Sequence, residues 1–409
     1  MAQWLDDLQF YTMHFMPYVH LPPDHKKYDS LWVDFSNRFF DPQKGHELYQ
    51  RYMSEMVLAD QLGYDAVVVN EHHNTVYSMM PVCTVMAAAL IPQTRRAKIC
   101  CFGVPVNLEM PNRLAEAYAM LDVMSGGRLE IALPLGTGME YWANSINPAT
   151  ARARFRESLE VLLQAWTQDG PTTFDGEFFN YRYLNPWPRP MQRPHPKIAI
   201  VGSGSPETVQ IAAERGFGYS SVFVPIAAQE KTFRRLREEM PKYGHNFTPD
   251  KAMFNAIVYV AENEQLAEQE FKEHLRFWIE DTARTTPRFL NPPGYISPDQ
   301  LRTRASATAS HGGFDWDVLT SQWRIVFGTA EKIANTLGQW CESADSSRVI
   351  LHHHIGDMPH WKVVKNMTLF AEEVIPRLRG RRASSQSHPQ SEVRAAGAGA
   401  GVDAAAGGR

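Results

Sequence analysis

In the stretch DAVVVNEHH, residues 65–73, a short and continuous run of apolar residues is followed at once by polar ones. Such a run, rich in β-branched residues, is typical of a strand in a parallel sheet that is covered on both faces. The stretch RVILHHH, residues 348–354, has the same character near the other end of the chain. Both stretches therefore predict buried strands that end in histidines.

Eight predicted strands alternate with segments whose apolar residues recur every three or four positions, as on one face of a helix. The predicted strands cover residues 10–16, 65–70, 98–106, 128–134, 197–202, 219–224, 252–262 and 348–354. This alternation predicts the α/β fold class, as a (β/α)8 TIM barrel with loop insertions. An open, doubly wound sheet is the alternative.

One barrel domain is predicted over residues 1–380, followed by a disordered tail over residues 381–409. The tail contains AAGAGAGVDAAAGG and buries too little apolar surface to offset the entropy of ordering. Long insertions are expected at four places in the barrel. Those that follow strands lie on the catalytic face, where they act as lids or substrate walls. The insertions cover residues 17–45, 137–151, 170–196 and 272–321.

The composition argues against several classes of protein. The chain of 409 residues is 44% hydrophobic and has a formal net charge of −4, which argues against a nucleic-acid partner. A membrane helix needs about 20 apolar residues, and the longest apolar run, residues 82–91, has about ten, so no membrane contact is expected. The four cysteines show no CxxC spacing, which predicts a cytoplasmic protein without structural zinc.

His72 is the first candidate for chemistry. In a barrel, Glu71, His72 and His73 follow the second strand and stand on the rim where catalytic groups belong. Histidine transfers protons near neutral pH, so a proton-handling role is one interpretation. The other is a hydrogen-bonded histidine pair that only shapes the loop.

The segment VGSGSPET, residues 201–208, is the second candidate. A strand ends, small residues turn the chain, and a helix begins with Ser205 as N-cap and Pro206 at its first position. The free N–H groups of this helix start, with Gly204 beside them, predict a site for a single phosphate group. A plain capped helix is the alternative. The GxGxxG dinucleotide motif fits poorly, because Glu207 stands at its third glycine.

The histidines at 352–354 are the third candidate. Period 2 places His352 and His354 on one face of a strand, and together with His14 they could form a metal site. Carboxylate ligands are not obviously placed beside them, so we expect no metal. A role as pocket wall or proton donor is the stronger interpretation.

Four segments, in this order and spacing, resemble the bacterial luciferase-like, flavin-dependent monooxygenase family. They are EHH (71–73), MLDVMSGGRLEIALPLGTGMEYW (120–142), RARFRESLEVLLQAWT (152–167) and PRPMQRPHPKIAIVGSGSPETVQIAAERG (188–216). The likeness extends from about residue 9 to residue 379, with a gap at the 17–45 insertion.

The resemblance implies a (β/α)8 barrel, usually a homodimer, that binds reduced FMN (FMNH2) or its deazaflavin relative F420. It gives His72 a catalytic role at the reactive face of the flavin. The residues that it assigns to the cofactor lie at three places on the rim, with Ser205 and Thr208 at the phosphate. They are Gly103, Asn107, Tyr141, Ser203, Gly204, Ser205 and Thr208.

The activity that the resemblance implies is oxygenation of a small, largely apolar organic substrate by reduced FMN and O2, through a C4a-peroxyflavin. A separate NAD(P)H:flavin reductase would supply the flavin, because the chain shows no nicotinamide site. Pro134 and Leu135 replace a cysteine and an arginine of the luciferases, so light emission is not implied. Three alternatives stay open: F420-dependent hydride transfer, a metal-dependent hydrolase using His14, His352 and His354, and flavin binding without turnover.

Overall fold

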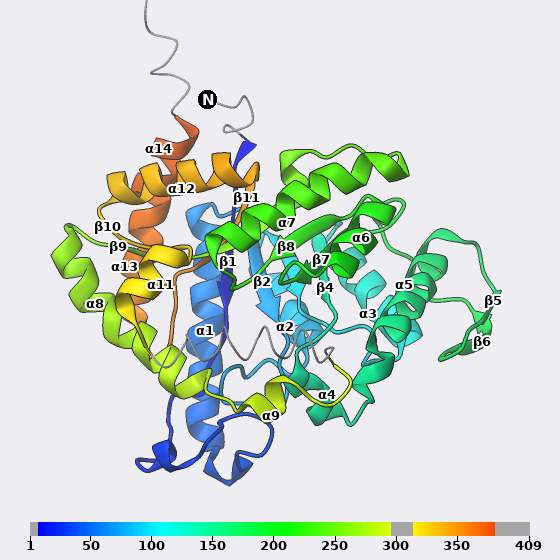
Figure 1. The fold of residues 1–409 in the computed structure, drawn as a ribbon, viewed down its shortest axis with the longest axis horizontal. Helices are drawn as coiled ribbons and strands as arrows, with labels where there is room; N and C mark the ends of the chain where they lie inside the picture. Colours follow the sequence, from blue (N-terminus) through cyan, green and yellow to red (C-terminus); the bar gives the residue numbers. More distant parts are fainter. Residues whose placement is uncertain (1–6, 296–313, 381–409) are drawn as a thin grey trace, which may run out of the picture.

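Eight parallel strands close into a barrel in the computed structural model, which describes residues 7–295 and 314–380 (Figure 1). They are β1 (Gln9–His14), β2 (Ala66–Asn70), β3 (Lys98–Phe102), β4 (Leu129–Pro134), β7 (Lys197–Gly202), β8 (Gly218–Ser221), β9 (Ala252–Val260) and β11 (Arg348–His352). Each lies within or beside a predicted strand, which confirms the (β/α)8 barrel.

The barrel is closed by pairing between β8 and β9. Tyr219 of β8 lies opposite Ala252 of β9, and the other edge of β9 pairs with β11, where Met253 lies opposite Arg348. The remaining neighbours follow in chain order from β11 through β1 to β8. An open sheet would leave two unpaired edges, so the doubly wound alternative is wrong.

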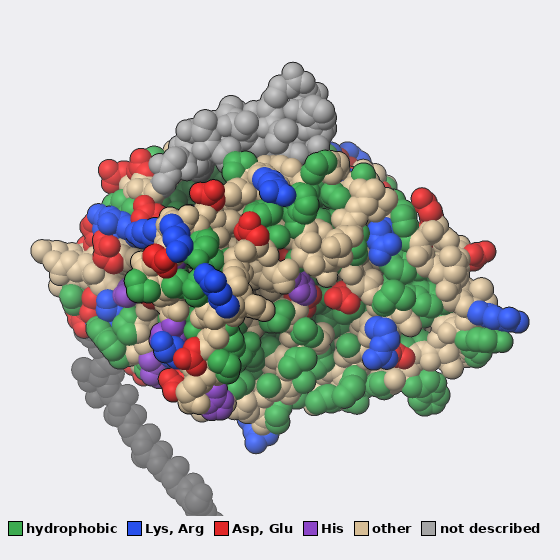
Figure 2. All heavy atoms as spheres, turned by 90° about the horizontal axis from the view of Figure 1, so that it is seen from below, with side chains coloured by type: hydrophobic (Ala, Val, Ile, Leu, Met, Phe, Trp, Pro, Cys, Tyr) green, Lys and Arg blue, Asp and Glu red, His purple; other side chains and the backbone are tan. Residues whose placement is uncertain are grey.

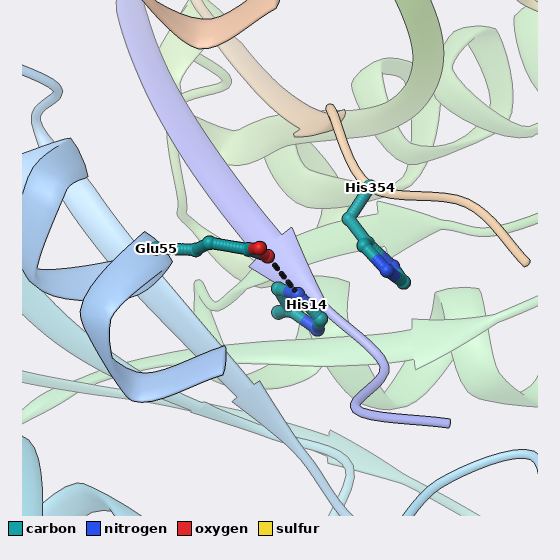
Figure 3. A group of neighbouring side chains, drawn as sticks. All are labelled: His14, Glu55 and His354. Carbon is teal, nitrogen blue, oxygen red and sulfur yellow. Dashed lines mark hydrogen bonds and ion pairs between the residues drawn. The ribbon is translucent and has the colours of Figure 1, made fainter. Parts of the chain in front are cut away.

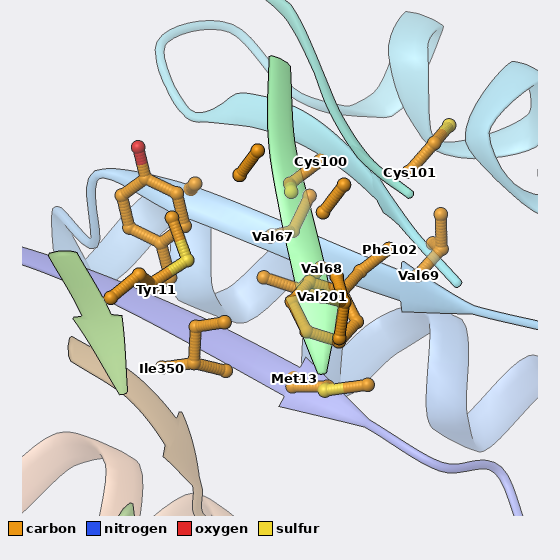
Figure 4. Packing of buried hydrophobic residues seen from close by; sticks show 14 of the residues in the cluster. Tyr11, Met13, Val67, Val68, Val69, Cys100, Cys101, Phe102, Val201 and Ile350 are labelled. Atoms are coloured by element: carbon orange, nitrogen blue, oxygen red, sulfur yellow. The ribbon is translucent and has the colours of Figure 1, made fainter. Parts of the chain in front are cut away.

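The strands are apolar on both faces because both faces are covered. Figure 4 shows buried side chains of β1, β2, β3, β7 and β11 packed together. All five residues of β2 are buried, as the run AVVVN predicts. At the lower rim of the barrel interior, opposite the catalytic face, Glu130 accepts hydrogen bonds from Tyr11 and Lys98 and faces Arg348.

Helices form the outer layer and begin and end where their sequences predict. Ser205 caps α6 by accepting a hydrogen bond from the N–H of Thr208, and Gly63 ends α1 in the left-handed conformation, with φ of 89°. The helices of this layer are α1 (Pro42–Leu62), α2 (Cys83–Leu90), α3 (Pro111–Met124), α5 (Ala151–Thr167), α6 (Pro206–Arg215), α7 (Ile226–Glu239), α8 (Glu264–Phe277), α12 (Ala330–Ala344), α13 (His360–Leu369) and α14 (Ile375–Arg379).

The insertions carry structure that the sequence did not predict. Residues 170–196 contain an antiparallel hairpin, β5 (Thr172–Asp175) and β6 (Asn180–Leu184). Just after the last insertion, the unpredicted strand β10 (Ile325–Gly328) pairs with the end of β9 beyond β8. The first insertion is tied to the loop after β2 by an antiparallel bridge between Trp32 and Thr75.

Three short helices lie in the later insertions: α4 (Gly138–Asn144), α9 (Pro287–Leu290) and α11 (Trp316–Gln322). Part of the 272–321 insertion and the whole 381–409 tail lie outside the described residues. The division into one domain and a tail therefore stays a prediction. Within the described ranges, no helix is both long and apolar enough to cross a membrane.

Candidate active site

The face where the barrel strands end carries the predicted site residues. Figure 2 views the molecule from this side and shows histidine and acidic side chains near the middle of the face, amid many hydrophobic ones. His72 and His73 follow β2, and their side chains are 21% and 19% exposed. The structure thus places His72 on the rim, where the sequence predicted it.

His72 is held by an acidic partner that sequence reasoning missed. Its Nδ1 lies 2.9 Å from Oε1 of Glu140, which belongs to α4 after strand β4. The other carboxylate oxygen of Glu140 accepts a hydrogen bond from the backbone N–H of His73, at 3.2 Å. Glu140 is itself buried, with a side chain 3% exposed. The carboxylate therefore fixes both the ring and the backbone of the histidine pair.

The second histidine, His73, is surrounded by carboxylates. Its Nε2 lies 3.5 Å from Oε1 of Glu71. Burial alone would lower the pKa of His73, but the hydrogen bond to Glu71 and the negative charges of Glu140 and Glu109 raise it above the ordinary value. Burial raises the pKa of the Glu109 carboxyl, as does repulsion from Glu71. Both shifts favour the protonated form of the side chain at the rim after β2.

The predicted phosphate segment folds into a tight polar turn at the start of α6. The hydroxyl oxygens of Ser205 and Thr208 lie 2.8 Å apart, and the hydroxyl of Tyr219 lies 3.1 Å from that of Thr208. Gly204 has φ of 91°, and a Cβ there would meet Oγ1 of Thr232 at 2.2 Å. Only glycine fits this turn, and Ser203 beside it is exposed. Hydroxyl groups and a helix N-terminus are the groups that bind phosphate.

The predicted residues after β3 and β4 also meet. Nδ2 of Asn107 donates to the hydroxyl oxygen of Tyr141 at 2.7 Å. Gly103 has φ of 126°, and a Cβ there would lie 3.2 Å from the backbone nitrogen of Glu71. Gly103 therefore lets the chain after β3 pass close to the segment that carries His72.

Helix α5 contacts both this group and the start of α6. Nε of Arg154 in α5 donates to the backbone oxygen of Asn107 at 3.0 Å. Two residues earlier in the same helix, Nε of Arg152 lies 2.6 Å from Oε2 of Glu207, the second residue of α6. The structure therefore brings Asn107, Tyr141 and the 203–208 turn to one side of the barrel mouth.

Buried polar atoms without a hydrogen-bond partner lie at the ends of several barrel strands. Such atoms are rare in native proteins, and they indicate a ligand or ordered water beside them. Among the described residues they include Nδ2 of Asn70, Oδ1 of Asn107, Oγ1 of Thr137, Oγ of Ser221 and Nδ1 of His352. Together they offer donors and acceptors to a polar ring system in the mouth, so the site fits a flavin.

The structure does not bring His14, His352 and His354 together as a metal site. Nε2 of His352 lies 2.8 Å from Nδ2 of Asn255, and its ring stacks on Phe15. The ring of His354 stacks instead on His14, at 4.2 Å. The prediction that His352 and His354 share a face is wrong, because β11 ends at His352 and the alternation of a strand ends with it.

The group that does assemble is His14, Glu55 and His354 (Figure 3). The backbone N–H of Met16 donates to Nδ1 of His14 at 2.9 Å, so the ring proton is on Nε2, which lies 2.8 Å from Glu55. Both nitrogens of His14 are thus used within the protein. A metal at Nε2 would have to displace that proton, and this supports the expectation of no metal.

A family model described as luciferase-like monooxygenase matches residues 33–345. The chain belongs to this family. It is 28% identical over 184 residues to an uncharacterized protein of Sinorhizobium fredii, which covers 44% of this chain and 53% of the relative. It is 26% identical over 251 residues to the oxygenase component of a flavin-dependent trigonelline monooxygenase from Acinetobacter baylyi, which covers 58% of this chain and 66% of the relative. The matches thus span less than two thirds of these relatives.

Solved structures share the fold over most of the chain. A monooxygenase from Streptomyces bottropensis superimposes with a TM-score of 0.70 at 24% identity and covers 90% of this chain and 99% of its own. An FMN-bound type II Baeyer–Villiger monooxygenase from Pseudomonas putida gives 0.67 at 18% identity, covering 90% and 98%. An F420-dependent secondary alcohol dehydrogenase gives 0.66 at 18% identity, covering 91% and 99%. At these identities the likeness shows the fold alone.

Proposed function

We propose that this protein is an FMN-dependent monooxygenase that uses reduced FMN and O2 to oxygenate a small, largely apolar organic substrate. The observation that carries the proposal is the placement of the His72–Glu140 pair and the 203–208 turn on one barrel rim, in a member of this family. A trigonelline monooxygenase and an FMN-bound Baeyer–Villiger enzyme among its relatives and structural neighbours support this chemistry.

The start of α6 would hold the phosphate end of FMN. Ser205 and Thr208 present hydroxyl groups, and Gly204 allows the backbone to approach the phosphate closely. Asn107, Gly103 and Tyr141 would lie along the ring, where Oδ1 of Asn107 is buried and unpartnered in the described structure. When bound, reduced FMN supplies the electrons that activate O2.

His72 would accept or hold a proton beside the reacting groups. With Nδ1 bonded to Glu140, a neutral ring carries its proton on Nδ1, which leaves the lone pair of Nε2 directed away from the carboxylate. The negative charge of Glu140 would stabilise the imidazolium that forms when Nε2 takes a proton. The ring edges of Trp32 and Tyr77 pack at His72, at 5.2 and 5.1 Å, and restrict water there.

A homodimer is part of the proposal, supported by an exposed apolar face on α2 and α3. Monomeric proteins rarely expose so many large apolar side chains together. Those on or beside the two helices are Val82 (49% exposed), Val85 (66%), Met110 (53%), Met120 (54%), Val123 (42%) and Met124 (46%). Sedimentation equilibrium should show a dimer, and Val85→Asp with Met120→Asp should give a monomer that still folds.

A separate NAD(P)H:flavin reductase would supply the reduced flavin, and a cytoplasmic location would suit both the reductase and the buried free thiols of Cys83, Cys100 and Cys101. The reductase need only meet the protein transiently. It can be replaced in the test by chemically reduced flavin, so the test of the oxygenase does not depend on finding it.

The test measures flavin binding and then oxygen transfer. Under anaerobic conditions, reduced FMN should bind more tightly than reduced riboflavin, and Ser205→Ala with Thr208→Ala should remove that preference by weakening FMN about tenfold, because the phosphate loses two hydrogen bonds. Mixing with isotope-labelled O2 and a panel of apolar ketones and thioethers should then yield a labelled product. Hydrogen peroxide as the sole product with every compound would contradict oxygenation.

F420-dependent hydride transfer is the second candidate, because an F420-dependent alcohol dehydrogenase shares the fold. Competition between reduced FMN and reduced F420 for the flavin-free protein separates the two. Tighter binding of F420, together with alcohol oxidation in which oxidised F420 takes up the hydride in the absence of O2, would replace the first proposal by the second.

A further inference from the structure

A cavity of about 530 Å³ lies beside the barrel mouth but apart from the predicted flavin site. It is formed by the first insertion and by the loop after β2. Its lining consists of Tyr18, Leu21, Pro22, Leu31, Val33, Asp34, Phe35, Ser36, Asn37, Phe39, Phe40, Asn74, Thr75, Val76 and Met79. A volume of this size accommodates a small organic molecule.

A wall one residue thick separates this cavity from His72. Trp32 and Thr75 form an antiparallel bridge, and the N–H of Val33 donates to the oxygen of Asn74 at 2.7 Å. Leu31 and Val33 line the cavity, whereas Trp32 between them packs against the ring of His72. Trp32 therefore lies between the cavity and His72.

The wall includes one strained residue. Val33 is β-branched and has φ of 62°, whereas Asn74 has φ of 49°, which asparagine adopts readily. Left-handed conformations of β-branched residues are rare, and they cluster at sites that bind ligands. Both residues line the cavity. The strain therefore lies at the surface that a ligand would touch.

The charge of the lining selects the ligand. Asp34 is exposed at the cavity, and no Lys, Arg or His of the described chain pairs with it or lines the cavity. A carboxylate without a direct ion-pair partner, next to an apolar surface, attracts cations and repels anions. This separates the cavity from the 203–208 turn, whose chemistry suits phosphate.

The aromatic part of the lining also suits a cation. Tyr18 packs against Phe40 with ring centroids 5.0 Å apart, and Phe35 stacks on Phe39 at 5.3 Å. This cluster already holds one cation from outside the cavity, because Cζ of Arg38 lies 4.6 Å from the centroid of the Phe39 ring. Ring faces attract ammonium and guanidinium groups.

We propose that this cavity binds an apolar organic cation, with Asp34 as its charge partner and the Tyr18–Phe35–Phe39–Phe40 cluster around its apolar body. The site is distinct from the flavin site. It does not depend on the proposed oxygenase reaction, because the cavity exists in the folded chain without flavin.

The experiment is calorimetric titration of the full-length, flavin-free protein with three probes of similar size. They are 1-naphthylmethyl-trimethylammonium, neutral 1-naphthylmethanol and anionic 1-naphthylacetate. We expect affinity to fall in that order. Saturable binding of the cation that survives addition of excess FMN would support a separate site, whereas competition with FMN, equal affinities for the three probes, or no binding would overturn the proposal.

Variants of exposed residues locate the site. Asp34→Asn should weaken the cation about threefold or more and leave the neutral probe unchanged, and Asp34→Lys should reverse the order of cation and anion. Asp29→Lys is the matched control, because it makes the same charge change in the same insertion at an exposed residue outside the lining. Equal effects of the two lysine variants would refute a role for Asp34. Asn37→Trp should weaken all three probes by filling the cavity.

Discussion

Two groups of histidines, both placed directly after barrel strands, have opposite surroundings. His72 and His73 follow β2, are about one fifth exposed, and each lies against a carboxylate. His352, His353 and His354 end or follow β11 and are fully buried. Burial lowers the pKa of His352 and of His353 to about 3. At neutral pH the second group therefore stays uncharged, while His73 in the first is stabilised as a cation.

This comparison shows that a histidine after a barrel strand is not by itself a catalytic group. Position brings the side chain to the rim, but proton exchange also needs access to the mouth and a nearby charge that stabilises the protonated ring. Glu140 supplies that charge to His72, at 2.9 Å. His354 has no hydrogen-bond partner for either ring nitrogen.

Replacing His72 should have the largest effect. His72→Ala should lower the rate of product formation about 10²- to 10³-fold, because the proton acceptor beside the flavin is lost. Binding of reduced FMN should change little, since the phosphate contacts are made elsewhere on the rim. Single-turnover kinetics and anaerobic titration measure the two quantities. His354→Phe is the control from the buried group, and it should keep normal turnover. Equal losses of turnover in both variants would show that the two groups of histidines do not differ in function.

Glu140→Gln should have the next largest effect. The amide retains a hydrogen-bond acceptor for His72 but removes the charge that stabilises the imidazolium, so we expect kcat to fall about tenfold with KM nearly unchanged. Glu140→Asp keeps the charge and should restore part of the activity. A purely structural role for Glu140 would instead lower thermal stability in both variants and leave kcat of the folded enzyme intact.

The buried histidines after β11 should affect the pH dependence of stability and leave activity unchanged. Burial, together with the nearby His14, lowers the pKa of His354 well below its ordinary value. Below about pH 6.5 the unfolded chain therefore takes up a proton at this residue that the folded chain does not, and stability falls as pH decreases. One such group contributes at most about 1.4 kcal/mol per pH unit.

His354→Phe removes this titration, so urea unfolding between pH 7 and pH 5 should show a shallower loss of stability than in wild type. The same substitution leaves the His72–Glu140 and His73–Glu71 pairs in place, but it removes the ring that stacks on His14. An unchanged slope would mean that His354 is protonated, or hydrogen-bonded through water, in the folded protein.

The smallest expected effect is that of removing metal from the protein. Since both nitrogens of His14 are used by Met16 and Glu55, purified protein should contain well below one equivalent of zinc or other transition metal per chain. Chelation should leave thermal stability and flavin binding unchanged. One equivalent of metal per chain that is lost in a Glu55→Gln variant would contradict this expectation. It would show that the His14–Glu55–His354 group is a metal site.

Local patterns in the sequence were enough for the barrel and for parts of the site. Runs such as AVVVN can be buried on both faces only in a covered parallel sheet, so the strands and the position of His72 followed from them. The start of α6 could also be predicted, because its signals lie within one turn: Ser205 caps the helix and Pro206 stands at its first position. The closure of β8 onto β9 completed the architecture that the alternation implied.

Only the tertiary structure decided which side chains meet. Glu140 lies 68 residues from His72 in sequence, and Glu55 lies 41 from His14, so no spacing rule could pair them. Spacing also could not predict the bridge between Trp32 and Thr75, which forms the wall between the second cavity and the barrel mouth. Backbone hydrogen bonding and apolar burial repeat along a chain and leave a pattern, whereas the contacts that set the charge of a histidine or the shape of a pocket arise between distant segments and leave none.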